Sequence, residues 1–203
     1  MTIGAQRTGD WALARRLLAG APARLRGAID VALRQEAQAL RAEIVTGLTK
    51  QAPGGDPIRP LAKSTIAARA MKKFRGTKAL LRRGDLRGSI TAYVENGKAF
   101  VGVSRSARRR GGASLVNVAQ VQEFGSQPSL IPVTPKMRRF LVVLFKRLGA
   151  SLRRRRGGQG TGVVVAQIPP RPFLRPAFAK YQRGAQGRFL RRIAKLSGLG
   201  GQP

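Results

Sequence analysis

Apolar residues recur at three- to four-residue multiples along residues 23–49, at Leu25, Ile29, Leu33, Leu40, Ile44 and Leu48. This spacing places them on one face and predicts a long amphipathic helix. The sequence QAPGGDP at 51–57 ends the pattern, because glycine and proline both break helices. Before residue 23 the helical pattern is interrupted by Gly20, Ala21 and Pro22. Residues 1–22 are therefore expected to be an N-terminal extension outside the long helix.

Strands are predicted by two runs of β-prone residues, 89–94 and 99–104. They flank the pair Asn96-Gly97, which favours a tight hairpin because both residues accept a positive φ angle. The run VVVAQI at 163–168 predicts a further short strand. Residues 116–125 alternate only in part and are compatible with either a strand or a short helix.

Further helices are predicted later in the chain. Residues 61–75 carry a short helical pattern, and Thr134 followed by Pro135 is typical of an N-cap and a first helical position. The last helix is expected to have Pro176 in its first turn. Its apolar side is formed by Phe178, Tyr181, Ala185, Phe189, Ile193 and Leu196.

Together these elements indicate a single α+β domain over residues 1–203. The long N-terminal helix and the closing helices are expected to pack on a small antiparallel sheet that contains the Asn-Gly hairpin. Residues 197–203 are expected to be a flexible tail.

The net positive charge of the chain predicts a polyanion or an acidic protein as a partner. Forty basic and 8 acidic residues give a net charge of +32. Coding bias would explain part of the excess of arginine over lysine, but not the shortage of acids. Two arginine runs are candidates for contact with DNA phosphates or an acidic protein: Arg108, Arg109 and Arg110, and Arg153, Arg154, Arg155 and Arg156.

Several classes of chemistry are excluded by residue types that the chain lacks. It has no cysteine and no histidine, which excludes disulfides, the usual zinc sites and nucleophiles paired with histidine. The 8 acids are scattered and form no cluster for metal-assisted phosphoryl chemistry. We therefore expect neither an enzyme nor a bound cofactor. No apolar run approaches the ~18 residues of a membrane span, and we expect synthesis in the cytosol.

The segment IPPRPFLRPAF, residues 168–178, is stiff, apolar and poor in backbone donors because it has four prolines. Such a strip is fixed in advance and loses little entropy on docking, so it predicts an interface with another subunit. Phe173 and Leu174 are the expected anchors, while packing of Phe173 into its own core is the alternative. The candidate interface residues are Glu123, Arg171, Pro172, Phe173, Leu174, Arg175 and Pro176.

Three motifs carry a resemblance to a known family: RRGDLRGSI at 82–90, VAQVQEFGS at 118–126 and IPPRPFLRPAF. In this order they resemble the tail-completion or head–tail joining proteins of tailed bacteriophages, often labelled virion morphogenesis or minor tail proteins. The chain departs from the family pattern at Arg83 and Ser126, where threonine is usual. It also has an insertion at 127–162 that holds a predicted helix and an arginine-rich loop.

The resemblance implies a structural subunit that forms a ring, commonly of six copies, at the neck or tail end of a virion. Its expected partners are copies of itself, neighbouring connector and tail proteins, and, as a further candidate, the DNA in the channel. The expected location is the virion after assembly in the host cytoplasm. Glu123 is then a candidate for a salt bridge between subunits, for instance to an arginine of the 168–178 segment, with an exposed acid of little consequence as the alternative.

Charge argues that DNA is not the only partner of such a ring. A channel about 40 Å tall faces only about 24 phosphates, since duplex DNA carries one charge per about 1.7 Å. Six copies at +32 each carry far more charge than these phosphates can match, so most of the positive charge must face solvent or acidic proteins. The competing function is a basic nucleic-acid-binding protein, which explains the charge but not the RPFLRPAF motif.

Overall fold

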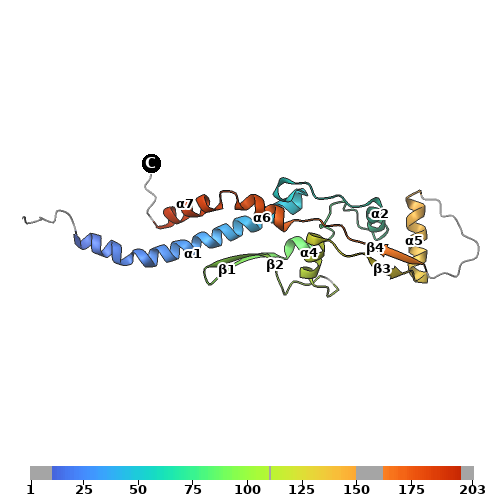
Figure 1. Cartoon of the computed structure of the whole chain (residues 1–203), viewed down its shortest axis with the longest axis horizontal. Coiled ribbons are helices and arrows are strands. Elements are labelled where there is room, and N and C mark those ends of the chain that lie inside the picture. The colour runs from blue at the N-terminus through green and yellow to red at the C-terminus, as the bar shows by residue number, and fades with distance from the viewer. Residues whose placement is uncertain (1–10, 110, 150–161, 198–203) are drawn as a thin grey trace, which may run out of the picture.

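Helix α1, Trp11–Lys50, runs along the long axis of the molecule (Figure 1). The computed structural model describes residues 11–109, 111–149 and 162–197. The expected α+β class is confirmed, although the strands within these residues form two separate two-stranded sheets and not one. The inner face of α1 buries Ala28, Ala32, Ala37, Leu40, Ile44 and Leu48. Of the predicted apolar face, Leu40, Ile44 and Leu48 are thus buried, whereas Ile29 and Leu33 are half-buried and Leu25 is 41% exposed.

The predicted break before the long helix is wrong, because α1 continues through Pro22. A proline inside a helix leaves the carbonyl four residues earlier without its usual partner. Pro22 is exposed, so water can satisfy that carbonyl. The expected extension at 1–22 is therefore helical from Trp11 onward, while residues 1–10 lie outside the described part of the chain.

The hairpin lies along one side of α1 (Figure 1). Strand β1, Ile90–Glu95, pairs antiparallel with β2, Lys98–Val103, and the last pair is Glu95 with Lys98. Asn96 and Gly97 form the turn with φ angles of +49° and +68°. The local pattern thus predicted the hairpin correctly, because a two-residue turn of this kind needs positive φ at both positions.

The closing helices lie on the other side of α1 (Figure 1). They are α6, Leu174–Gln182, and α7, Ala185–Ser197. The sequence predicted one continuous helix here. The helix is instead interrupted between Gln182 and Ala185, where Gly184 has a φ of +72°. Pro176 lies in the first turn of α6, as predicted.

The core lies where α1 meets the hairpin, α6 and two short connecting helices. These are α3, Asp85–Gly88, and α4, Leu115–Phe124. The segment 116–125, compatible with strand or helix from its sequence, is therefore mostly helical. The core is formed by Leu40, Ile44, Leu48, Leu86, Ile90, Ala119, Phe173 and Ala177.

A short turn of 3-10 helix, η1 at Pro53–Gly55, fastens α6 to the end of α1. A Cβ atom on Gly54 would lie 2.4 Å from the carbonyl oxygen of Pro176. Only a glycine allows the two backbones to approach this closely. The PGG turn that ends the long helix thus also positions the first turn of α6.

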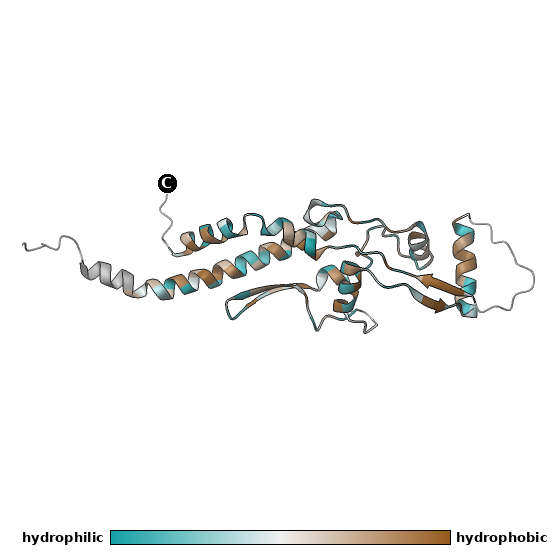
Figure 2. Ribbon diagram, in the orientation of Figure 1, coloured by the Kyte–Doolittle hydropathy of each residue, from teal (hydrophilic) through white to brown (hydrophobic). Residues whose placement is uncertain are grey.

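The far end of the molecule holds α2, Lys63–Met71, α5, Pro135–Arg147, and the second sheet (Figure 1). In this sheet β3, Ser129–Pro132, pairs antiparallel with β4, Val163–Ala166. The sequence pattern predicted β4 but not β3. Thr134 caps α5 as predicted, because its hydroxyl accepts a hydrogen bond of 3.2 Å from the amide of Met137. Figure 2 shows both strands as hydrophobic ribbons.

Candidate functional site

The carboxylate of Glu123 binds the N-terminus of α6 and joins two of the sequence motifs within one chain. It accepts hydrogen bonds from the backbone amides of Phe173 (2.8 Å), Leu174 (3.1 Å) and Arg175 (2.9 Å). These amides have no partner inside the helix, and the positive end of the helix dipole favours a negative charge there. The side chain of Glu123 is only 4% exposed, so water competes little for these bonds.

The backbone amides of residues 168–175 in the proline-rich strip all find acceptors in this neighbouring segment. Between Ile168 and Arg175 three residues are prolines, and the five remaining amides all donate to residues 122–126. The amide of Ile168 donates to the Ser126 hydroxyl at 2.9 Å, and the amide of Arg171 to the Gln122 carbonyl at 2.6 Å. The prolines therefore remove only donors that would have had no acceptor here.

Gly125 is required at the point where the two segments touch. Its φ is +84°, and a Cβ atom there would lie 3.1 Å from both the carbonyl oxygen of Ile168 and the ring of Pro170. A side chain would be strained in this conformation and crowded by its neighbours. The next residue, Ser126, returns a backbone hydrogen bond of 2.9 Å to the Ile168 carbonyl. The Glu-Phe-Gly-Ser sequence is thus shaped by contact with the strip.

The guanidinium of Arg171 also lies inside the chain. Its Nε and one terminal nitrogen donate to the carbonyls of Arg59 (3.0 Å) and Pro60 (3.3 Å). Arg171 is 8% exposed. It therefore fastens the segment before α2 to the proline-rich strip.

These positions correct the predicted interface. Phe173 is 0% exposed in the core, and Glu123 and Arg171 are also buried with partners from their own chain. The expected docking anchor Phe173 and the expected salt bridge of Glu123 between subunits are therefore wrong in this fold. The reason is that α4 and η1 enclose the inner side of the strip. Pro176 is half-buried against η1, whereas Pro172 is exposed.

The outer side of the strip forms an exposed apolar surface, here called the Phe178 patch and defined by Phe124, Leu174, Arg175 and Phe178. Phe124 is 63% exposed and Phe178 is 53% exposed. The guanidinium of Arg175 lies 4.8 Å from the centre of the Phe124 ring, and its Nε lies 3.5 Å from the Glu123 carboxylate. Leu174 and Phe178 line a mainly apolar cavity of about 430 Å³ against α1 and β2.

Two further apolar surfaces lie elsewhere. Tyr93 and Phe100 stack with ring centres 5.1 Å apart on the hairpin and are 55% and 43% exposed. At the far end, β3 and β4 expose Leu130, Val163 and Val165 by more than half. A two-stranded sheet is marginally stable alone, so the far sheet gains from any partner that covers it.

The predicted arginine runs are only partly within the described residues. The exposed Arg108 donates to the carbonyl of Arg105 at 3.0 Å, whereas Arg109 lines a large basic cavity. Arg110, Arg153, Arg154, Arg155 and Arg156 lie outside the described residues, as does most of the loop in the predicted 127–162 insertion. Sequence analysis missed the basic cavity, because its residues come from segments between 59 and 171 and show no local pattern.

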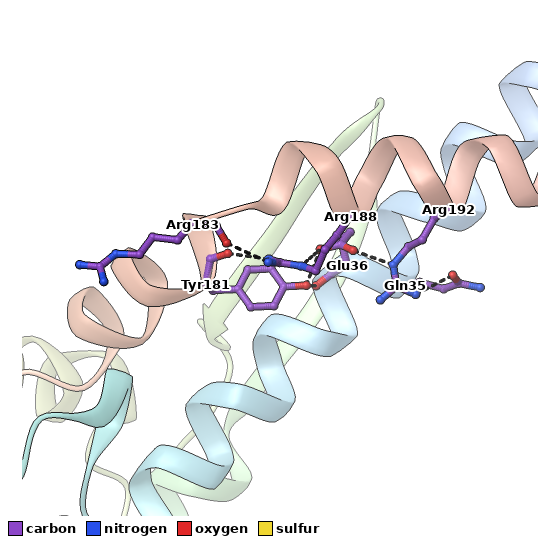
Figure 3. Close-up of polar contacts among 6 residues, drawn as sticks. All are labelled: Gln35, Glu36, Tyr181, Arg183, Arg188 and Arg192. Carbon is purple, nitrogen blue, oxygen red and sulfur yellow. Dashed lines mark hydrogen bonds and ion pairs between the residues drawn. The ribbon is translucent and has the colours of Figure 1, made fainter.

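A half-buried ion cluster holds α6 and α7 on α1 (Figure 3). Glu36 of α1 accepts a short hydrogen bond from the Tyr181 hydroxyl and one of 2.6 Å from Arg192 Nε. Arg188 lies 3.7 Å from the same carboxylate and donates to the Tyr181 carbonyl at 2.5 Å. Burial alone would raise the pKa of Glu36, but these hydrogen bonds and the two arginine charges outweigh it and lower the pKa below 4.5.

Acid should therefore loosen the closing helices. A carboxyl group whose pKa is lowered by folding stabilises the fold above its unfolded pKa, and this stability is lost as pH falls below about 4.5 through the folded pKa. Glu36→Gln should cost about 1.5 to 3 kcal/mol at neutral pH, because charge-assisted hydrogen bonds are lost. The difference in unfolding free energy between wild type and variant, measured by urea titration, should shrink in acid. Two results would contradict this role of Glu36: a free-energy difference that stays constant down to pH 3, or the same pH-dependent difference for the variant Glu95→Gln.

Comparison with known proteins adds no relative: no protein-family model, curated protein or solved structure matches this chain. Within the described residues, no three or more carboxylates gather in a group that could hold a metal ion. No helix in the same residues is long and apolar enough to cross a membrane. The site must therefore be interpreted from its own geometry and from the motifs.

Proposed function

We propose that this chain is a structural virion protein that assembles into a ring at the head–tail junction or tail end of a tailed phage, with six copies as the expected number. The observation that carries the proposal is the Phe178 patch, where two motifs that build the core on one side each present one large aromatic side chain, Phe124 or Phe178, on the other. Exposed aromatics beside an apolar cavity are typical of a surface that another protein covers. The three motifs in their order support a phage ring subunit, so the protein expected to cover the patch is a neighbouring subunit of the ring.

The arrangement suits repeated assembly. The strip is held by five hydrogen bonds that its backbone amides donate and by the contact of Pro176 with Gly54, so its outer face is fixed before a partner arrives. A rigid surface loses little entropy on binding. Arg175 over Phe124 adds a cation beside the aromatic surface, and arginine and aromatic residues are enriched at interfaces.

The test is the size of the particle in solution. Wild-type protein should form a defined ring by mass photometry at elevated salt, where loose association through charge is screened. Phe178→Ser should weaken the association at least about tenfold, as loss of an interface aromatic does. Leu190→Ser on α7 is the matched control, since Leu190 is 55% exposed and Phe178 53%.

Two results would overturn the proposal. The first is a wild-type monomer at all concentrations that binds DNA with steep salt dependence, which would favour the nucleic-acid-binding alternative. The second is a ring that Phe178→Ser and Leu190→Ser affect equally. Circular dichroism should show both variants folded, because exposed side chains change stability by only about 0.5 kcal/mol.

A further inference from the structure

A large basic cavity lies between α2, the segment before α3, α4 and the start of the proline-rich strip. Its volume is about 960 Å³, within the range of ligand-binding pockets. Among the described residues that line it, eight are arginine or lysine and one, Asp85, is acidic. Within the described part of the chain, none of these eight cations forms an ion pair with a carboxylate. The cavity is therefore a concentrated and uncompensated positive site.

Arg82 lines this cavity and has an unsatisfied donor. Its Nε is buried without a hydrogen-bond partner, the one such side-chain atom in the described residues. The guanidinium is held 4.1 Å from the centre of the Phe74 ring, and that of Arg83 lies 5.2 Å from the same ring. A buried polar donor without a partner is costly, and a fixed guanidinium is preorganised for a carboxylate.

Two neighbouring arginines show the same excess of positive charge. Burial lowers the pKa of Arg69, and the charges of Arg82 and Arg171 lower it further. Burial also lowers the pKa of Arg171, together with the charge of Arg59. An anion in the cavity would relieve this repulsion. The carbonyls that Arg69 and Arg171 already bind hold the walls in place but carry no full charge.

The rest of the lining is apolar and restricts the kind of anion. Leu61, Leu80, Leu115, Val118 and Phe140 contribute to the cavity wall. A ligand that fills the cavity should therefore carry apolar groups as well as negative charge. Duplex DNA is too wide to enter and has its phosphates on the outside, so it could touch only the cavity mouth.

A second copy of this chain cannot supply such a ligand. Its 8 acids are all at least six residues apart in the sequence, so no segment presents several carboxylates together. We propose that the cavity binds an acidic segment of a different protein, in which carboxylates alternate with large apolar side chains. This inference concerns a surface separate from the Phe178 patch and does not depend on ring formation.

The test is fluorescence anisotropy at physiological ionic strength with a short labelled peptide in which glutamates alternate with leucines. A matched peptide with serines in place of the leucines separates apolar recognition from charge. Arg82→Gln should weaken binding of the glutamate–leucine peptide about tenfold, the effect of losing one charge-assisted contact. Arg191→Gln removes the same charge from an exposed position on α7 and should leave the affinity within about twofold.

Lys63→Gln and Lys72→Gln give a second measurement should Arg82→Gln fail to fold, because both lysines are exposed at the cavity. Each should weaken binding while Arg191→Gln does not. Three results would overturn the proposal: equal losses for cavity and α7 variants, equal affinity for the leucine and serine peptides, or a DNA oligonucleotide that displaces the peptide and shows the same dependence on the cavity residues. The last result would assign the cavity to nucleic acid.

Discussion

Glu123→Ala should lower the free energy of unfolding by about 3 to 5 kcal/mol, the cost of removing one partner from a buried charged contact. Three amides at the start of α6 would lose their acceptor at once. Each buried donor left without a partner costs about 1 to 3 kcal/mol. Since domains are stable by only about 5 to 15 kcal/mol, this loss is a large fraction of the total stability. Urea unfolding followed by circular dichroism measures the change.

The matched control is Glu95→Ala in the hairpin. Glu95 is exposed, so its removal makes the same change in net charge and should alter stability by about 0.5 kcal/mol or less. Glu123→Gln keeps one acceptor oxygen and the shape of the side chain, and should fall between the two. Equal urea midpoints for Glu123→Ala and Glu95→Ala would show that the carboxylate does not hold α6.

Phe173→Ala should destabilise the subunit itself by about 3 to 5 kcal/mol, the usual cost of truncating a buried phenylalanine. Phe173 is fully buried in the cluster that includes Leu48 and Ile90. Truncation leaves a cavity that the closely packed neighbours cannot fill. Had Phe173 been the docking anchor expected from the motif, the same variant would stay folded and fail only to assemble.

Phe124→Ala is the matched control for this experiment. Phe124 is 63% exposed. Its substitution removes the same side chain but should change the free energy of unfolding by only about 0.5 kcal/mol. Thermal unfolding of both variants should show a large loss for Phe173→Ala only. A Phe173→Ala protein with the wild-type transition that no longer forms rings would instead support the docking role of Phe173.

The motif residues were recognisable from sequence, but their partners were not. The pairing of Glu123 with the proline-rich strip was anticipated as a salt bridge between subunits. In the structure the carboxylate mainly binds backbone amides of its own chain, with Arg175 at 3.5 Å. Fifty residues separate Glu123 from Phe173, and a sequence pattern carries no information on whether two such segments meet within one subunit or between two.

The inner and outer faces of the strip also required the structure. Phe173 and Phe178 are both aromatic residues of one motif, yet the first is buried and the second is 53% exposed. Which side chain faces inward depends on how α1, α4 and η1 surround the first turn of α6. The basic cavity depended on the structure even more, because its arginines and lysines come from several separate segments of the chain.

The sequence by itself determined the local elements and the charge. The helical course of α1, the Asn96-Gly97 turn and the Thr134 cap each depend on hydrogen bonds and periodicity within a few residues, so local patterns suffice to predict them. Only the tertiary structure decided that Glu123 caps α6. It also decided which aromatic residues stay exposed. These features depend on packing between distant segments, where the free energy of burying one group is set by neighbours that the local sequence does not specify.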